Sequence, residues 1–497
     1  MSHWDVHAVR LQKRVGIPSS QMGKLNNGVK TDHSHTAIVT ILLVLVALLL
    51  VPTMFTAAPS VYPTGTTRYD PDKAWNGYTI HDTPDEQGAV LIDMNGQVVR
   101  HWTELTAVPS PFRILPGGYV MGGTIPREPH QEAIALVQLD WDGNVVWEFQ
   151  NFEEVETEDG ATVWASRLHH DWQREGNPIG YYAPDASPRV NGGKTLVLSH
   201  TNLVQADITD KRLEDDVLLE VTWDGDVTWK WLASEHVDEF GFSEAERNAL
   251  YRSVQWNEER ESADWLHINA ASYVGPNHWY DDGDDRFHPE NIIWSSREAN
   301  IMAIIDREGA VVWRMGPDYR TDPALRELGQ IIGQHNPHII PKGLPGAGNL
   351  LVFDNGGEAG YGTPTPSAPT GRATVRRINS RVLEIDPVTF EKVWEYTLTG
   401  TERHRFFSHY VSNVQRLPNG NTMVTEGADG RIFELTADSE IVWEYVNPFF
   451  GTDPDTHRIY RAHRIPYDWV PQLSRPVERR VTPPNLSDFR LPPDPVD

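Results

Sequence analysis

The sequence predicts an all-β protein, a six-bladed β-propeller with an N-terminal transmembrane helix. Three observations lead to this prediction. A hairpin unit recurs six times, a second strand-and-turn motif lies between its copies, and one uncharged apolar stretch precedes them in the 497-residue chain. A chain of this length exceeds the usual size of one compact core, so a large repeat fold or several domains are expected.

Each copy of the hairpin unit has an apolar strand, a tight polar turn and a second strand that ends near Trp. Asn-Gly and Asp-Gly are hairpin turn residues, and Val, Ile and Trp favour strands. The six copies are 89–102, 135–149, 217–231, 301–315, 381–396 and 431–445. Their Trp residues are 45 to 84 positions apart, enough for one four-stranded blade each.

The second motif is an apolar strand beside a Gly-rich or Gly-Asn turn. It occurs at 113–123, 192–200, 348–357 and 417–427. Two hairpins in each unit make four antiparallel strands, and six units closed in a ring remove the exposed strand edges. An open β-sandwich array is the alternative, and six copies with one Trp each favour the ring.

Two stretches depart from the repeat. Residues 235–262 have helical spacing, with Ser243 as a candidate N-cap. Residues 275–291 form a predicted loop insertion with an acidic run from Asp281 to Asp285. The run could bind Ca²⁺ through its oxygens, but it lacks the full EF-hand pattern, and a solvated acidic loop is the preferred interpretation.

The N-terminal region predicts a membrane anchor. Residues 36–58 carry no formal charge, and the preceding segment has five Lys or Arg against two Asp, a net charge of +3 that leaves −30 for the rest. The positive-inside rule then places the N-terminus in the cytoplasm and the remainder outside the cell membrane, as a single-pass protein. A cleaved signal peptide ending near Thr56-Ala57-Ala58 is the alternative, although its basic segment would be long.

The expected organisation has five parts: a cytoplasmic basic segment (1–35), the anchor (36–58), a linker (59–75), the propeller domain (76–470) and a Pro-rich tail (471–497).

Composition excludes several classes of function. A net charge of −27 disfavours a nucleic-acid partner. The absence of Cys excludes disulfides, thiolate metal sites and Cys nucleophiles. The chain has 9 Lys and 34 Arg against 70 acidic residues, a balance typical of proteins from salt-rich environments, and we expect a halophilic protein. An ordinary acidic protein is the alternative.

Histidines recur at one position in successive blades, where the innermost strand begins. The motifs are LHHDW with His169 and His170, HIN with His267, and QHNPH with His335; His409 lies slightly before the same point in a later blade. Innermost strands converge on the central channel, so these side chains are expected to meet there. Asn269 lies two residues after His267, on the predicted same face, and Arg297 opens the next strand. An Arg fork suits a tetrahedral oxyanion.

At these motifs the chain resembles the arylsulfotransferases that need no nucleotide sulfate donor, over about 75–470. LHHDW (168–172), HIN (267–269), SSREANIMAIID (295–306) and QHNPHIIP (334–341) carry the resemblance, and a haloarchaeal-type member is expected. It implies a six-bladed propeller that moves a sulfuryl group from a phenolic sulfate ester to a phenol through a sulfated histidine.

By the same resemblance each candidate residue has an implied role. His335 is the nucleophile, His267, Asn269 and Arg297 hold the sulfuryl and phenolic oxygens, and His170 is a further channel histidine with His169 as the alternative. The shared covalent intermediate implies ping-pong kinetics. The partners are then a small phenolic sulfate donor and a phenol acceptor, together with the membrane.

Neither a cofactor nor a resident metal is predicted. Trp172 and Trp265 are candidates for stacking the phenols. The family's enzymes also carry an N-terminal β-domain that supports dimerisation. Here only about 20 residues separate anchor and propeller, so the resemblance does not imply a dimer, and the oligomeric state is left open. Two other hypotheses are a non-catalytic propeller that binds a surface partner or glycan, and a His-ligated metal site in the channel.

Overall fold

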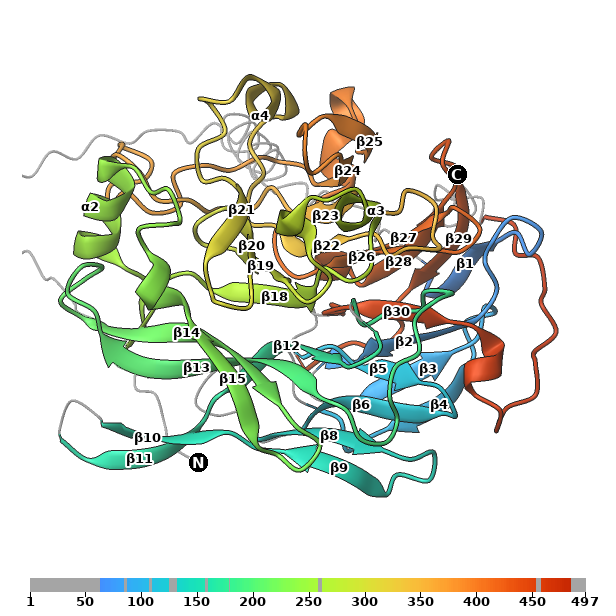
Figure 1. Cartoon of the computed structure of the whole chain (residues 1–497). Helices are drawn as coiled ribbons and strands as arrows, with labels where there is room; N and C mark the ends of the chain where they lie inside the picture. Colours follow the sequence, from blue (N-terminus) through green and yellow to red (C-terminus); the bar gives the residue numbers. More distant parts are fainter. Residues whose placement is uncertain are drawn as a thin grey trace, which may run out of the picture. The chain divides into compact units, whose positions relative to one another are not determined.

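The computed structural model describes residues 63–483 except 85–86, 107–109, 125–131, 157–159, 178, 258–261 and 453–456. It confirms the predicted six-bladed β-propeller: six antiparallel sheets each contain a four-stranded blade, and the sheets follow one another around a ring (Figure 1).

The blades share one order of strands from the channel outward. The first blade is β30 (Ala462–Ile465), β2 (Tyr78–Asp82), β3 (Ala89–Ile92) and β4 (Val98–Trp102); the second is β5 (Arg113–Leu115), β6 (Tyr119–Thr124), β8 (Ala135–Leu139) and β9 (Val145–Phe149); the third is β12 (Leu168–Arg174), β13 (Thr195–Val204), β14 (Arg212–Val221) and β15 (Val227–Leu232). The fourth is β18 (Ile268–Tyr273), β19 (Ile292–Ser296), β20 (Ile301–Ile305) and β21 (Val311–Met315); the fifth is β22 (His335–Ile339), β23 (Leu350–Asp354), β24 (Arg381–Ile385) and β25 (Lys392–Tyr396); the sixth is β26 (Asn413–Arg416), β27 (Thr422–Glu426), β28 (Arg431–Leu435) and β29 (Ile441–Val446).

The remaining elements are short additions to this ring. They are β1 (Gly65–Tyr69), β7 (Glu132–Ala133), β10 (Phe152–Glu156), β11 (Thr162–Ser166), β16 (Trp256–Asn257), β17 (Ser262–Asp264), α2 (Glu244–Ser253), α3 (His278–Asp281) and α4 (Pro323–Leu328), with 3-10 turns at Ala233–His236, Asp285–Phe287, Gly400–Arg405, Gly427–Asp429 and Tyr467–Trp469.

The six hairpin units of the sequence are the outer two strands of each blade. Five of their six recurring Trp residues donate a hydrogen bond to a neighbouring blade, and the sixth, Trp102, packs edge to face against Trp141. The indole N–H of Trp147 donates to the carbonyl of Trp223, at 2.8 Å, in the turn of the next hairpin unit. Trp229, Trp313 and Trp394 make the equivalent bond at 2.7 to 3.0 Å. A further bond of this kind, from Trp443 to the Met94 carbonyl at 2.9 Å, joins the last blade to the first.

The apolar core is divided into six clusters, and each cluster lies between two adjacent blades. Both ends of the described chain help to close the ring. β30, from the C-terminal part, is the innermost strand of the first blade, while β1 adds to β29 at the outside of the sixth. The segment expected to be a linker, 59–75, contains β1. Its backbone groups pair with β29 and with Val481, and this pairing makes the segment part of the propeller.

The two departures from the repeat have local structure. Ser243 caps α2 with a capping box to Glu246, which confirms the predicted N-cap. The insertion at 275–291 contains α3 and the 3-10 turn Asp285–Phe287. In its acidic run, Asp281 pairs with Lys342 and Asp284 with Arg286, at 2.8 and 2.7 Å.

The membrane prediction falls outside this part of the chain. Among the described residues no helix is long and apolar enough to cross a membrane. The predicted anchor, 36–58, lies outside the described residues.

Candidate active site

The structure brings the candidate histidines together at the start of three neighbouring innermost strands. His170 lies on β12, His267 directly precedes β18, and His335 begins β22. The rings of His170 and His267 meet edge to face, with centroids 4.7 Å apart. Burial and then the charge of His267 lower the pKa of His170.

An unusual backbone conformation marks this position. His170, His267 and Asn336 have φ values of +49°, +51° and +52°. The strand register shifts at each of the three places. A left-handed residue at a bulge interrupts the alternation of a strand and re-aims a side chain, and such strain is typical of functional sites.

Hydrogen bonds define which nitrogen of His335 carries the proton. Its Nδ1 lies 2.8 Å from Asn355 Oδ1 and 3.1 Å from the Gly333 carbonyl oxygen. The Asn355 amide nitrogen donates to the carbonyls of Ser408 and Val411, at 2.7 and 2.9 Å, so its oxygen faces His335. Both partners of Nδ1 accept, and the neutral ring therefore keeps its lone pair on Nε2. Burial lowers the pKa of His335 well below the ordinary value, which keeps the ring neutral.

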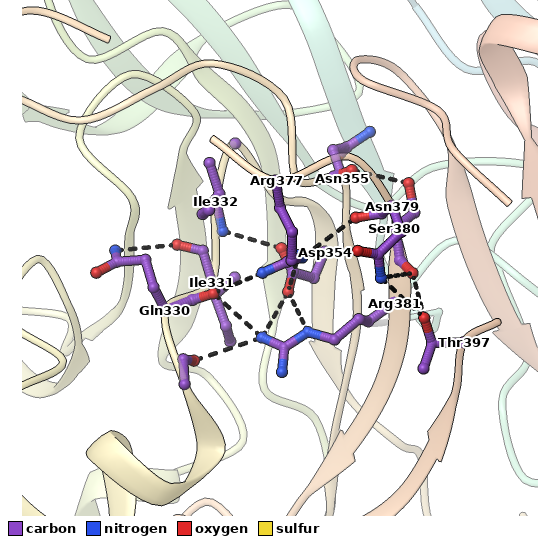
Figure 2. Close-up of polar contacts among 12 residues, drawn as sticks. Gln330, Ile331, Ile332, Asp354, Asn355, Arg377, Asn379, Ser380, Arg381 and Thr397 are labelled. Carbon is purple, nitrogen blue, oxygen red and sulfur yellow. Dashed lines mark hydrogen bonds and ion pairs between the residues drawn. The ribbon is translucent and has the colours of Figure 1, made fainter. Parts of the chain in front are cut away.

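An ionic network beside Asn355 holds the chain that leads into His335 (Figure 2). Asp354 accepts from Arg381 Nε and pairs with Arg377, both at 2.7 Å, and its other oxygen accepts from the Ile332 backbone N–H at 2.9 Å. Arg377 and Arg381 also donate to the carbonyl of Gln330. The network ties β23 and β24 to the segment just before β22.

The two adjacent histidines of LHHDW face different surroundings. His170 lies against His267, whereas the His169 ring stacks on His200 with centroids 3.5 Å apart. The Nδ1 atoms of His169 and His170 are 2.8 Å apart, so one of them donates to the other. Burial lowers the pKa of both well below the ordinary value. The structure therefore places His170 beside the other site histidines and His169 behind it.

His267 and Arg297 belong to the same corner of the site. His267 Nδ1 lies 2.5 Å from Asp264 Oδ2, which orients the ring. The backbone N–H of Arg297 donates to the His267 carbonyl at 3.1 Å, and its guanidinium pairs with Glu298. The Arg297 side chain is 23% exposed. Burial and also the positive charge of Arg297 lower the pKa of His335 and of His409, so the guanidinium is available to an anion bound beside these two rings.

Asn269 lies next to the residue that precedes His335. Its amide nitrogen donates to the Gln334 carbonyl at 2.8 Å, so this group supports the strand that carries His335. The expectation depended on strict alternation from His267. The left-handed His267 and the register shift between Ile268 and Ala270 break that alternation.

The two Trp candidates for phenol stacking are wrong. Trp172 and Trp265 are 2% and 0% exposed. Trp172 donates to the Pro111 carbonyl and lies under Arg113, and Trp265 donates to Asp215. Both side chains belong to the apolar core between neighbouring blades and are therefore not available to a substrate.

A buried ionic cluster crosses the channel next to the histidines. Asp171 pairs with Arg113 at 2.8 Å and with Arg461 at 3.0 Å, and Arg461 donates to the Asn269 carbonyl at 2.6 Å. These contacts join blades one to four. Burial and the two guanidinium groups act in opposite directions on Asp171, and its pKa is lowered overall.

The structure does not support a metal bound jointly by the channel histidines. Among the described residues, the groups with donor atoms close enough to share an ion are His169, His200 and Asp216, and Glu132, His200 and Glu214. His267 and His335 belong to neither group.

Two functional candidates escaped the sequence analysis. Asn355 lies within the predicted strand-and-turn motif 348–357, directly after β23, but nothing in that motif marks it as functional, and only its contact with His335 reveals a role. Arg461 directly precedes β30, which follows the sixth hairpin unit, so the repeat register did not assign it to a blade.

Fold and site together define a β-propeller enzyme with a histidine site on its inner strands. The family model of the arylsulfotransferases, "Arylsulfotransferase (ASST)", matches residues 78–447, and the chain belongs to this family. The protein is therefore a sulfotransferase in the general sense, with phenolic sulfate donors and acceptors as its substrate class.

Other comparisons add no functional argument. No curated protein matches the chain. A protein of unknown function from Bacteroides caccae is 11% identical, covering 79% of this chain and 99% of its own, with a TM-score of 0.39. A streptogramin B lyase structure is 12% identical, covering 78% and 85%, with a TM-score of 0.33. Both TM-scores are too low to carry a conclusion.

Proposed function

We propose that the protein transfers a sulfuryl group from a phenolic sulfate ester to a phenol by a ping-pong mechanism, with a sulfated His335 as the intermediate. The observation that carries the proposal is the tautomer of His335. Nδ1 is engaged by Asn355 and Gly333, so Nε2 of a neutral ring holds the lone pair that a nucleophile needs.

In the first half-reaction the Nε2 lone pair forms the N–S bond as the S–O bond to the donor phenol breaks. The transferring group carries spread negative charge, and stabilisation comes mainly from positioning and from fixed positive groups. Arg297 is the partly exposed guanidinium that can supply this charge, and His267, oriented by Asp264, lies beside His170 at the same site.

The donor oxygen leaves as a phenolate, and His170 is the proposed hydrogen-bond donor to it. Burial lowers the pKa of His170 well below the ordinary value, so the neutral ring donates a hydrogen bond and keeps its proton. In the second half-reaction the acceptor phenolate oxygen attacks sulfur while the N–S bond breaks. Water protonates the released phenolate and takes the proton of the acceptor phenol, so the balances close over the two steps with His335 restored.

The cellular setting is a further part of the proposal. We propose that 36–58 anchors the protein in the cell membrane with the propeller outside the cytoplasm, that the acidic surface suits high salt, and that the protein is of haloarchaeal type. Support comes from the charge asymmetry and Lys/Arg balance of the sequence. Labelling of intact cells with an impermeant reagent tests the orientation.

The chemistry is tested with the full chain, 4-nitrophenyl sulfate and a phenol acceptor, in high and low salt. We expect a stoichiometric burst of nitrophenol without acceptor, and an acid-labile sulfuryl group on His335 by peptide mass spectrometry. His335→Ala should abolish both. His338→Gln is the matched control, because His338 lies on the same strand, is 1% exposed and bonds Tyr181 instead.

Full activity of His335→Ala would refute the nucleophile. No nitrophenol from the folded native protein in high salt would favour the non-catalytic propeller.

A further inference from the structure

A second cluster of histidines and carboxylates lies in the third blade, behind His170. His169 on β12, His200 on β13 and Asp216 on β14 are neighbours on three adjacent strands. Their side chains are buried, with exposures of 0%, 2% and 0%. The Nε2 atoms of His169 and His200 lie 3.5 and 3.7 Å from the same atom, Asp216 Oδ1.

Both Nε2 atoms face the Asp216 carboxylate. His200 Nδ1 lies 2.9 Å from Glu132 Oε1, so Nδ1 carries the proton that this carboxylate accepts. His169 Nδ1 is engaged with His170 at 2.8 Å, and His169 Nε2 is buried without a hydrogen-bond partner. A buried ring nitrogen without a partner is costly, and a cation bound between it and Asp216 removes that cost.

Charge around the cluster points the same way. Glu132, Glu214, Asp216 and Asp264 are all at most 3% exposed. Arg167, whose guanidinium lies 3.7 Å from Glu214, offsets part of this charge. Carboxylates gathered in this buried cluster favour the binding of a divalent cation.

We propose that His169 Nε2, His200 Nε2 and Asp216 bind one Zn²⁺ ion. Two imidazoles with a carboxylate are a donor set that zinc prefers over Mg²⁺ or Ca²⁺. Zn–N bonds of about 2.05 Å with tetrahedral angles separate donor atoms by about 3.3 Å, close to the distances to Asp216 Oδ1. Glu132 would hold His200 through Nδ1, as outer carboxylates commonly do for zinc ligands. The imidazole rings are inclined by only 12°, so binding must tilt them apart to bring the ion into both ring planes.

Zinc at this site would act on catalysis through His170, and this link rests on the proposed function. With the ion on His169 Nε2, His169 carries its proton on Nδ1 and donates it to His170 Nδ1. His170 must then hold its own proton on Nε2, the tautomer that can donate a hydrogen bond to a departing phenolic oxygen. The zinc site itself does not depend on sulfuryl transfer.

The test measures metal content of the full chain. Native protein is stripped with dipicolinate and titrated with Zn²⁺ against a chromophoric chelator. We expect one tightly bound Zn²⁺ for each chain that depends on Asp216, and an affinity at least about 100-fold weaker in Asp216→Asn and His200→Gln. Asp215→Asn is the matched control. Asp215 is the next residue on β14, equally buried, and accepts from Ser234 and Trp265 instead.

Two outcomes overturn the site: stripped native protein that takes up no Zn²⁺, or Asp216→Asn that binds it as tightly as Asp215→Asn. If the variants do not fold, the native protein is loaded with Co²⁺. An intense tetrahedral visible spectrum supports the site, and a weak octahedral spectrum overturns it. Zinc binding without any sulfuryl transfer would refute the proposed function and leave the zinc site standing.

Discussion

Asn355 offers the sharpest test of how the site prepares His335, through the substitution Asn355→Leu. The change removes three hydrogen bonds, to His335 Nδ1, the Ser408 carbonyl and the Val411 carbonyl, at 2.8, 2.7 and 2.9 Å. Buried groups left without partners cost about 1–3 kcal/mol each. Ser408 O keeps a weak contact from Ser380, so we expect a loss of about 2–4 kcal/mol of stability.

The catalytic effect is set by what remains at Nδ1. The Gly333 carbonyl, 3.1 Å away, can still accept its proton, so the correct tautomer is not lost. A wrong tautomer costs about 10⁴-fold in a serine protease triad, whereas loss of an orienting partner typically costs 10–100-fold. We therefore expect sulfation of His335 to slow about 100-fold in Asn355→Leu, measured as the nitrophenol burst under single-turnover conditions.

Asn277→Leu is the matched control for this experiment. Asn277 is 1% exposed, donates to two backbone carbonyls at 2.8 Å and accepts one backbone N–H at 3.0 Å, far from His335 in the chain. It should lose comparable stability and keep its burst rate. A burst in Asn355→Leu within threefold of native, or an equal slowing in Asn277→Leu, would refute the reasoning.

Asn355→Asp separates orientation from charge. A carboxylate at 355 still accepts from Nδ1 but favours protonated His335, whose pKa burial now holds well below the ordinary value. Only the neutral ring is nucleophilic, so the rate falls as pH drops through this pKa. The acid limb of the pH–rate profile should therefore move to higher pH in Asn355→Asp; an unmoved limb would mean that another group controls it.

Three further variants test other parts of the structure. Arg297→Lys keeps the charge but loses the fork, and kcat/KM should fall about 10²–10³-fold with unchanged melting temperature; activity within threefold of native would remove Arg297 from the site. Asp354→Asn replaces the carboxylate that accepts from Arg381 with a neutral amide, and should lower both the melting temperature and the burst rate. A lowered melting temperature with an unchanged burst rate would mean that Asp354 contributes to stability and not to catalysis. Burial raises the pKa of Asp82 to about 7, so the native state binds more protons than the unfolded chain between about pH 4 and 7, and stability falls as pH rises through that window. Asp82→Asn can still accept from Tyr460, and its unfolding free energy should decline less over that window, by up to about 4 kcal/mol; parallel curves would contradict this.

Periodicity explains how much of the fold could be predicted. A hairpin unit is local, and its turn residues, strand formers and Trp recur whatever the rest of the chain does. The Trp bonds between blades, such as Trp443 to Met94, follow from that repetition. The way the ring closes was harder to predict from the sequence, because β1 and β30 belong to no repeat and pair with strands hundreds of positions away.

The site was predictable to the same extent. Repeat register indicated that His170, His267 and His335 would begin neighbouring inner strands, and they do. Strict alternation does not hold around Asn269, because the left-handed His267 precedes it and the strand register shifts between Ile268 and Ala270. The burial of Trp172 and Trp265 could not be predicted from the sequence either, since packing between blades depends on neighbours far away in the chain.

Sequence alone determined the number of blades, the strand pattern and the residue types available for sulfuryl chemistry, because these follow from short-range patterns. Only the tertiary structure decided which nitrogen of His335 is unprotonated, which of His169 and His170 faces His267, and what Asn355 does. Protonation and orientation depend on partners that the ring of blades brings together, and no local pattern in the chain specifies those partners.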